Sequence, residues 1–506
     1  MLARVTTFAI DGLDPRRVTV EVDVRAGLPA FTIVGLADQA VREARERVRS
    51  AVLNSGFEFP LKRVTVNLAP ASLRKSGPGF DLAIACAILA AGGQVPPSAL
   101  EQWAIFGELA LGGELRPCRG ALAAAEGTLR AGLAGIVVPV ERALEAALVE
   151  DLEVIGAGTL AEVAAVLRGG ERPPPPARAE LPSQEALLPD LGDVRGHPDV
   201  IGALTVAAAG GHNLLLSGPP GVGKTMLARR MPSILPPLTR TEALEVTRIH
   251  SVAGYHDGSG LVGARPFRAP HHTISASGLV GGGATPAPGE ASLAHHGVLF
   301  LDELTEFPRS TLEALRQPLE DGRAAIVRGQ RAAIFPTRFM LLAATNPCPC
   351  GHAPDPRCRC TESDLTRHRR RLSGPLLDRI DLQVHVQRPD AASLTGESKS
   401  SSAAQRALVL EARARQAKRL ADAGLFCNAH MDSRTLRARV GLDADAEQPL
   451  TAAYRRGDLS ARGRDRALRV ARTVADLAGS DDVCREHVIT ALGFRADMAA
   501  GTGLAA

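Results

Sequence analysis

Apolar residues recur along the first third of the chain in two rhythms. Residues 17–24 alternate between apolar and polar, which predicts a strand with one buried face. Residues 38–54 carry apolar side chains at helical spacing, residues 80–91 are almost wholly apolar, and residues 135–139 form a short apolar run. Helical and strand patterns that follow one another in this way predict an α/β domain over residues 1–168.

A change of composition separates this domain from the rest of the chain. Residues 173–176 are four consecutive prolines, which favour extended polyproline II, and we expect a semi-rigid linker over residues 169–185. Apolar runs and helical patterns return over residues 186–389, which predicts a second α/β unit. The remaining residues, 390–506, show helical spacing alone, so we expect an all-helical domain there.

One stretch joins a strand to a helix through glycines. Residues 214–216, three leucines, predict a short buried strand, and residues 218–225 fit the G-x-x-x-x-G-K-[ST] pattern of a phosphate-binding loop. In such a loop Lys224 neutralises the β- and γ-phosphates and Thr225 is a ligand of Mg²⁺, while backbone N–H groups surround the phosphate oxygens. The alternative is an ordinary Gly-Pro turn. The predicted nucleotide-binding residues are Gly218, Pro219, Pro220, Gly221, Val222, Gly223, Lys224, Thr225 and Met226.

Two later apolar runs also end in polar residues. Residues 297–301 predict a buried strand that is followed by Asp302 and Glu303. If this strand lies parallel to the strand before the glycine loop, Asp302 holds the Mg²⁺ and Glu303 polarises the attacking water. An acidic turn is the alternative, which the glycine loop earlier in the chain disfavours. Residues 339–345 repeat the pattern and end at Asn346.

Two segments between these strands are candidates for contact with a substrate. Residues 321–335 predict a β-hairpin, and Arg328 and Arg331 at its tip are our candidates for contacts with the phosphates of a substrate, which the resemblance given below implies is DNA. Solvated arginines at a hairpin tip are the alternative. Residues 263–290 are rich in glycine and proline, which predicts turns and hairpins in a loop that faces a pore.

Cysteines and histidines gather in a few places. Four thiols flank a Pro/Gly turn and predict a tetrahedral structural Zn²⁺ site, with reduced free thiols as the alternative. These thiols are Cys348, Cys350, Cys358 and Cys360. At His271-His272 and His295-His296 we expect no metal, because adjacent side chains on an extended chain point to opposite sides.

Composition narrows the class of protein. The chain has 506 residues, 45% of them hydrophobic, which suits a globular protein of about three domains. It contains no run of ~20 uncharged apolar residues and no signal-peptide pattern, so we expect a cytoplasmic protein without membrane contact. The formal net charge of +4 permits an anionic partner such as DNA without requiring one.

Two motifs of the first domain resemble the proteolytic domain of Lon-type proteases, an α/β fold of the ribosomal S5 domain 2-like class. They are residues 73–81, Leu-Arg-Lys-Ser-Gly-Pro-Gly-Phe-Asp, and residues 106–117. The resemblance implies a serine nucleophile and a later lysine base. Gly79 stands at the nucleophile's position, however, and the segment after Pro117 contains no lysine. We therefore expect a protease fold without proteolysis, used for assembly or for nucleic-acid contact.

Three polar residues of the second half resemble functional positions of AAA+ ATPases. Asn346 matches the residue called sensor 1, and Arg379 matches the arginine finger that reaches into a neighbouring subunit's site. Arg462 resembles the sensor 2 arginine of a helical lid, and Arg464 and Arg466 are the further candidates for that position. An ordinary salt bridge of Arg379 and a solvated basic helix around Arg462 are the alternatives. The predicted catalytic set is Lys224, Asp302, Glu303, Asn346, Arg379 and Arg462.

The chain as a whole is identified as a member of the ComM/YifB family of magnesium-chelatase-like AAA+ ATPases. The segments that carry this resemblance are residues 265–272, 297–307, 346–351 and 372–382. The resemblance implies a P-loop AAA+ core with a helical lid, and a homo-hexameric DNA motor that uses ATP and Mg²⁺. It further implies branch migration in homologous recombination during natural transformation, with recombination proteins as candidate partners. The alternatives are a magnesium-chelatase-type motor subunit and, with less support, an ATP-dependent protease.

Overall fold

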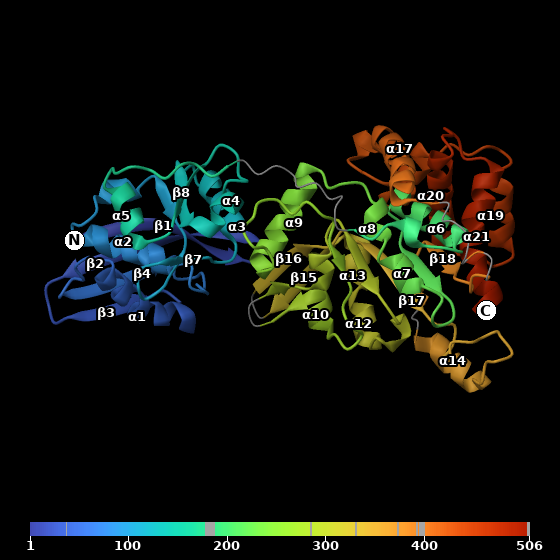
Figure 1. Cartoon of the computed structure of the whole chain (residues 1–506), viewed down its shortest axis with the longest axis horizontal. Helices are drawn as coiled ribbons and strands as arrows, with labels where there is room; N and C mark the ends of the chain where they lie inside the picture. The colour runs from blue at the N-terminus through green and yellow to red at the C-terminus, as the bar shows by residue number, and fades with distance from the viewer. Residues whose placement is uncertain are drawn as a thin grey trace.

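Three parts follow one another along the long axis of the molecule. The structure, a computed structural model, describes residues 1–36, 38–177, 188–283, 286–328, 331–371, 374–390, 393 and 400–502. An α/β domain holds the N-terminus at one end, a second α/β unit occupies the middle, and the C-terminal helices lie at the other end (Figure 1). None of the helices in the described ranges is long and apolar enough to cross a membrane.

A seven-stranded mixed sheet organises the N-terminal domain, in the order β3-β4-β2-β1-β5-β8-β9. The β1–β2 and β2–β4 pairs are antiparallel and the other pairs are parallel. The predicted strands are confirmed in β2 and β8. The strands are β1 (Leu2–Asp11), β2 (Asp14–Arg25), β3 (Ala30–Val34), β4 (Arg63–Ala69), β5 (Trp103–Ile105), β8 (Gly135–Pro139) and β9 (Glu153–Ala157).

Helices cover both faces of this sheet. On one face lie α1 (Gln39–Asn54), α2 (Asp81–Ala91) and α5 (Leu160–Leu167). On the other face lie α3 (Ala121–Arg130) and α4 (Ala143–Ala146). Every residue of α2 is buried, which explains its almost wholly apolar sequence. Asp38 fixes the start of α1 by accepting the N–H of Val41 at 3.0 Å.

Five parallel strands form the second sheet, in the order β11-β14-β17-β10-β18. They are β10 (Leu214–Ser217), β11 (Phe267–Arg268), β14 (Val298–Leu301), β17 (Met340–Thr345) and β18 (Leu382–His385). All residues of β10, β14 and β17 are buried, because helices cover both faces of the sheet. Strands buried on both faces read as continuous apolar runs, which is why the sequence predicted them correctly.

The helices of this unit fall into two layers. On one face of the sheet are α6 (Pro198–Gly210), α7 (Lys224–Ala228) and α8 (Met231–Ile234). On the other are α10 (Ala276–Val280), α11 (Glu290–Leu293), α12 (Arg309–Ala314) and α15 (Gly374–Leu377). Residues 263–290 were expected to form only turns and hairpins, and α10 corrects this. It forms because Ser275 caps it by accepting the N–H of Gly278 at 3.1 Å.

Helix α9 (Arg240–Ala253) and a hairpin join the two α/β units. The predicted hairpin is confirmed as β15 (Arg323–Arg328) and β16 (Arg331–Pro336), which pair antiparallel. Ile249 of α9 packs in one core with Phe335 of the hairpin and Leu13 of the N-terminal domain. Arg248 donates to the carbonyl of Leu13 at 2.9 Å. The base of the hairpin therefore rests on the turn between β1 and β2.

The C-terminal region is helical where it is described, apart from one isolated bridge between Leu442 and Val483. Its helices are α17 (Ser402–Leu420), α18 (Ser433–Arg439), α19 (Glu447–Arg455), α20 (Ala461–Leu477) and α21 (Arg485–Thr502). Helices α17 and α20 share a hydrophobic core with α6 of the second α/β unit. The expectation of helices alone is thus confirmed for residues 400–502.

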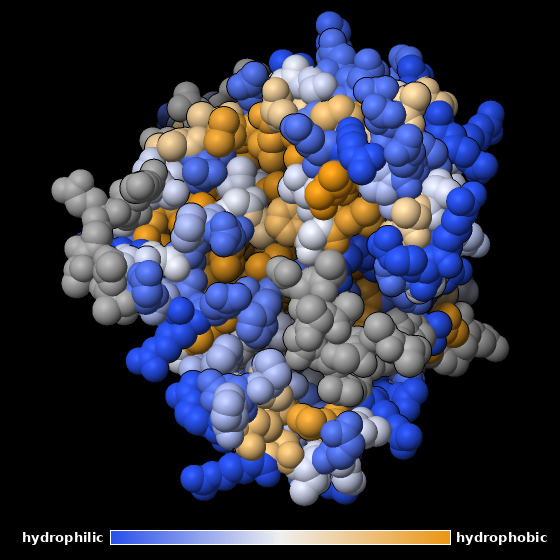
Figure 2. Space-filling view, turned by 90° about the vertical axis from the view of Figure 1, so that its right-hand side faces the viewer, coloured by the Kyte–Doolittle hydropathy of each residue, from blue (hydrophilic) through white to orange (hydrophobic). Residues whose placement is uncertain are grey.

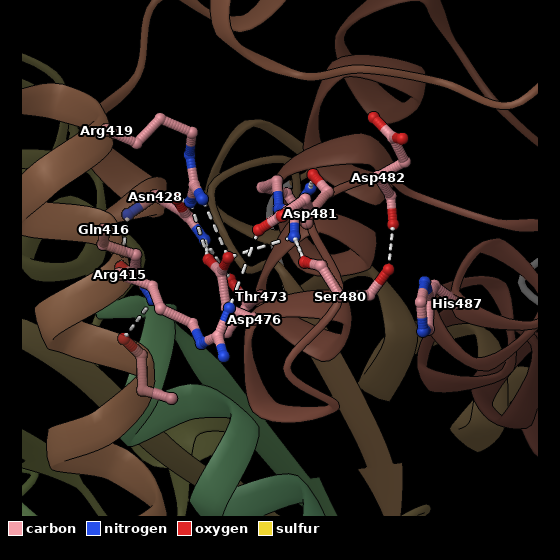
Figure 3. Close-up of polar contacts among 12 residues, drawn as sticks. Arg415, Gln416, Arg419, Asn428, Thr473, Asp476, Ser480, Asp481, Asp482 and His487 are labelled. Atoms are coloured by element: carbon pink, nitrogen blue, oxygen red, sulfur yellow. Dashed lines mark hydrogen bonds and ion pairs between the residues drawn. The ribbon is translucent and has the colours of Figure 1, made fainter.

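A buried polar cluster holds α17 and α20 together. Figure 3 shows Arg419, Asn428 and Thr473 gathered around Asp476. The Asp476 carboxylate accepts from Arg419 at 2.7 Å and from Asn428 at 2.9 Å, and it pairs with the fully buried Arg472 at 3.1 Å. Removal of one member of a buried charge group is strongly destabilising, because its partners then stay buried without a counter-charge.

We expect Asp476→Asn to lower the opening free energy of α20 by about 3 kcal/mol, because it leaves Arg419 and Arg472 without their carboxylate. Native-state hydrogen exchange of the α20 amides measures this. Asp458→Asn is the matched control, since Asp458 forms an exposed pair with Arg456 and its loss should change the same amides by less than about 0.5 kcal/mol. Equal effects of the two substitutions would contradict a stabilising role for the cluster.

Candidate functional site

The glycine loop between β10 and α7 forms a tight cradle. Gly221 and Gly223 have φ of 78° and 90°, a left-handed conformation that side chains disfavour. At Gly218 a Cβ atom would lie 2.3 Å from the carbonyl oxygen of Val386, so no side chain fits there. Lys224 folds back, and its Nζ donates to the carbonyls of Gly218 and Pro219 at 2.6 and 2.8 Å.

Three strand ends bring the predicted polar residues together. Lys224 Nζ also donates to Oδ1 of Asn346 at 3.0 Å, across from the end of β17. Thr225 Oγ1 donates to Oδ2 of Asp302 at 2.7 Å, beyond the end of β14. Burial lowers the pKa of the Lys224 ammonium, and the carboxylates of Asp302 and Glu303 partly oppose this shift. The site thus concentrates one ammonium, one amide, one hydroxyl and two carboxyl groups.

Glu303 has an unusual backbone conformation. Its φ is 52°, and its N–H donates to Oδ1 of Asp302 at 3.0 Å. A non-glycine residue in this region costs roughly 1–3 kcal/mol and is held only where its surroundings fix it. The exposed Glu303 carboxylate lies 3.7 Å from Nδ1 of His272. From the sequence we considered His272 only as a possible metal ligand. We did not predict that it lies beside Glu303.

Arg379 and Arg462, the two predicted catalytic arginines, lie away from the glycine loop. Arg379 and Arg462 both line a cavity of about 590 Å³ beside Asn213. Asn213 precedes β10 and Gly218 follows it, so at ~3.3 Å per residue this cavity is roughly 16 Å from the glycine loop, at the opposite edge of the sheet. Arg379 is mostly buried and forms an ion pair with Glu320. The structure therefore brings Arg379 and Arg462 together, but not with Lys224 of the same chain.

The hairpin arginines are placed only by their backbone. Arg328 and Arg331 face each other as the last pair of the β15–β16 ladder. Residues 329–330 and the side chains of these two arginines lie outside the described part of the structure. Their predicted contact with DNA therefore stays a prediction.

The four predicted cysteines converge. The Sγ atoms of all four lie within 4.8 Å of one another, with Cys348 at 3.4 Å from Cys350 and 3.8 Å from Cys358. Four sulfurs at ~2.3 Å around a tetrahedral Zn²⁺ lie roughly 3.8 Å apart, so the arrangement fits that ion. Backbone N–H groups of His352 and Arg359 lower the pKa of the Cys350 thiol to about 6, whereas desolvation and contacts with Cys350 and Cys348 raise the pKa values of Cys358 and Cys360. Without a metal the cluster therefore favours one thiolate rather than four.

The cysteine loop touches the glycine loop. Gly351, between Cys350 and His352, has a φ of 80°, and a Cβ atom on it would lie 2.5 Å from Cδ of Pro220. The two loops therefore pack with no room for a side chain at this point.

The two histidine pairs do not have the geometry that we expected from an extended chain. The rings of His271 and His272 lie 4.1 Å apart and those of His295 and His296 lie 4.0 Å apart, so neighbouring rings do not point to opposite sides. At the second pair the cause is a φ of 55° at His296, which turns both rings onto Glu245. Nδ1 of His295 accepts the N–H of Arg338 at 3.0 Å, so a neutral His295 carries its proton on Nε2. That nitrogen donates to Glu245 and has no lone pair for a metal.

The loop that resembles a protease nucleophile loop has no room for a nucleophile. A Cβ atom on Gly79 would lie 2.9 Å from Cε2 of Phe106. Lys75 is fully buried and donates to the carbonyl of Pro70. Among the residues described, no hydrogen bond links a serine hydroxyl to this lysine, which a Ser-Lys pair requires.

Comparisons with known proteins cover nearly the whole chain. Three family models match: "Magnesium chelatase, subunit ChlI" over residues 190–394, "Subunit ChlI of Mg-chelatase" over residues 20–142, and "Magnesium chelatase, subunit ChlI C-terminal" over residues 399–495. The competence protein ComM of Haemophilus influenzae is 43% identical over 510 residues, which cover 98% of this chain and 97% of that protein.

The chain belongs to the ComM/YifB family of magnesium-chelatase-like proteins. The uncharacterized protein YifB of Escherichia coli K12 is 43% identical over 503 residues, 98% of this chain and 97% of that protein. A Mycobacterium tuberculosis protein is 44% identical over 496 residues, 98% of each chain. Lon protease of Rhizobium meliloti is 28% identical over 199 residues, 37% of this chain and 24% of its own length. For this ComM/YifB member, the family supports an AAA+-type motor built on a parallel-sheet α/β core.

The contact between the cysteine loop and the glycine loop predicts an effect on nucleotide binding. We expect Gly351→Ala to weaken ATP binding by about tenfold, because the added methyl group displaces Pro220 or strains the loop by ~1–3 kcal/mol. Titration with a fluorescent ATP analogue measures the affinity. Gly424→Ala is the control, since Gly424 has a similar φ of 63° but nothing within 4 Å of its Cβ position. If both variants bind ATP like the unchanged protein, the contact has no effect on the site.

Proposed function

We propose that this protein is an ATP-driven DNA motor that acts as a ring, as a branch migration helicase in recombination during natural transformation. The observation that carries the ATPase part is the meeting of Lys224, Thr225, Asp302 and Asn346 at the ends of three parallel strands. The DNA part is supported by the near full-length similarity to a protein named for competence. ATP and Mg²⁺ are the proposed cofactors.

Each polar residue of the cradle has a proposed role in ATP hydrolysis. The phosphates would take the place of the loop carbonyls as partners of Lys224, whose ammonium neutralises their charge. Thr225 and Asp302 would hold Mg²⁺, which neutralises charge that develops on the transferred phosphoryl group. Asn346 would orient the γ-phosphate or the attacking water, and Glu303 would polarise that water. The glycine cradle and the oxygen-rich donor set fit this ligand pair.

The separation of the two clusters supports the proposed ring. Arg379 and Arg462 lie at the edge of the sheet away from their own glycine loop, with a cavity in front of them. We infer that they complete the nucleotide site of a neighbouring subunit in a homo-hexamer, where cationic side chains stabilise the charge of phosphoryl transfer. Arg464 pairs with Glu447 and Arg466 lies near Asp381, so Arg462 remains the proposed sensor 2 residue.

Two alternatives have weaker support. A magnesium-chelatase-type motor subunit is favoured by the names of the three matching family models, and it would hydrolyse ATP without response to DNA. An ATP-dependent protease is disfavoured by the lack of space for a side chain at Gly79. Recombination proteins remain candidate partners.

The proposal is tested by ATP hydrolysis and strand displacement in the same reactions, with no DNA, with single-stranded DNA and with a three-stranded junction. We expect DNA to stimulate hydrolysis and ATP to drive strand displacement. Lys224→Ala should abolish nucleotide binding, and Glu303→Gln should keep binding but slow turnover by at least about 100-fold, because the water loses its base.

Glu411→Gln is the control for loss of a carboxylate, since Glu411 is an exposed residue of α17 with one weak pair at 3.9 Å. Normal hydrolysis by Glu303→Gln would show that the site is assigned wrongly. Hydrolysis that is indifferent to every DNA, in protein shown to form rings, would favour the chelatase-type motor instead.

We also propose that Cys348, Cys350, Cys358 and Cys360 hold a structural Zn²⁺. The spacing of their sulfurs supports this, and a Cys₄ shell leaves no open position for catalysis. We expect about one zinc per chain by metal analysis of the purified protein, and less than about one tenth of that in the variant with all four cysteines changed to serine. Cys86→Ser is the control, because Cys86 is buried in α2 and lies apart from the cluster. Equal zinc in the two variants would refute the site.

A further inference from the structure

An arginine-rich arm extends from the cysteine cluster. Helix α14 (Glu362–Arg371) begins directly after Cys360 and projects with its loop from the body of the molecule (Figure 1). Thr361 fixes its start, since its Oγ1 accepts the N–H of Asp364 at 3.2 Å and donates to the Asp364 carboxylate at 2.8 Å. The cap therefore fixes the start of α14 next to the cysteine cluster.

A groove lies between this helix and residues 305–309. Its volume is about 410 Å³, and its charged lining consists of four arginines and one glutamate. These are Arg309, Arg367, Arg370, Arg371 and Glu306. Arg371 forms an ion pair with Glu306 at 3.2 Å, and Arg309 forms one with Glu313 at 3.0 Å. Figure 2 looks onto this end of the molecule, where hydrophilic residues cover much of the outer edge.

Arg367 and Arg370 have no close carboxylate partner. The charge of Arg367 acts on Asp364, one turn earlier, whose pKa is lowered first by hydrogen bonds from Thr361 and then by Arg367. Arg367 and Arg370 are three residues apart and so lie on one face of the helix, both exposed. Among the described residues neither forms an ion pair within 4 Å. Like charges one turn apart on a helix repel each other, and an anion in the groove would relieve that repulsion. The opposite face points inward, where the buried His368 lies 3.0 Å from the carbonyl of Asn346.

We propose that this groove binds the phosphate backbone of the nucleic acid on which the motor acts, a contact separate from the hairpin tip. This inference rests on the proposed DNA-motor function. A guanidinium presents paired N–H donors that match phosphate oxygens, and such contacts need no base sequence. Charge complementarity favours DNA as the occupant. Arg371 and Arg309 pair with Glu306 and Glu313, which leaves Arg367 and Arg370 as the cations of the groove without an ion pair among the described residues. The hydrogen bond of His368 to the Asn346 carbonyl connects α14, the helix that lines the groove, to the candidate nucleotide site.

The test is the salt dependence of DNA binding by Arg367→Gln/Arg370→Gln. Fluorescence anisotropy with a labelled single strand gives the affinity of the full-length protein with a non-hydrolysable ATP analogue, from 50 to 300 mM salt. Loss of two phosphate contacts should reduce the slope of log K against log salt by about 1.4, and weaken binding by roughly tenfold at low salt. Arg371 and His368 stay unchanged, because they contact Glu306 and Asn346.

The matched control is Arg455→Gln/Arg456→Gln, which removes the same charge from the exposed end of α19. Equal slopes for the two double variants would overturn the inference. If Arg367→Gln/Arg370→Gln forms rings only at higher protein concentration, measured by light scattering, and those rings keep the original slope, the arm contacts a neighbouring subunit instead. If the unchanged protein hydrolyses ATP but binds no DNA, the DNA-motor function itself fails, which is a separate result.

Discussion

The parallel register of β14, β17 and β10 is the constraint on which the rest of the structure depends. It brings Thr225 and Asp302 within 2.7 Å across 77 residues of sequence, and Lys224 and Asn346 within 3.0 Å across 122 residues. Because these strands are buried on both faces, a shift of register would break the packing of their apolar side chains against the helices and move Asp302 and Asn346 away from the glycine loop. The same packing energy that stabilises the sheet therefore fixes the geometry of the candidate ATPase site.

Two arginines lie at the edge of the sheet opposite the glycine loop. Arg379 precedes β18 and Arg462 lies near the start of α20, and the two line one cavity beside Asn213. The core shared by α6, α17 and α20, with the buried Asp476 cluster, holds the helical region against the sheet. A subunit of this shape presents the glycine loop with its candidate ATPase residues on one side and cationic groups on the other, which suits the proposed ring of identical subunits.

Much of this arrangement could be predicted from the sequence, because the decisive patterns are local. The buried strands appear as apolar runs, the glycines of residues 218–223 mark the loop, and the four cysteines lie within 13 residues. Contacts made by packing could not be predicted. His272 beside Glu303, Glu320 beside Arg379 and the groove of α14 each depend on how an insertion folds back on the core. The stacked histidine pairs contradicted a rule for extended chains, since His296 has a left-handed conformation.

The most direct test of the account is ATP hydrolysis by rings that contain two kinds of subunit. Lys224→Ala subunits keep Arg379, and Arg379→Ala subunits keep the glycine loop. Each alone should be nearly inactive, because an arginine finger contributes roughly 10³–10⁵ in rate. In rings mixed in equal amounts, about one quarter of the interfaces combine an intact loop with an intact arginine, and a comparable share of the original rate should return. No recovery in rings shown to be mixed, or full activity of Arg379→Ala alone, would contradict a site divided between subunits.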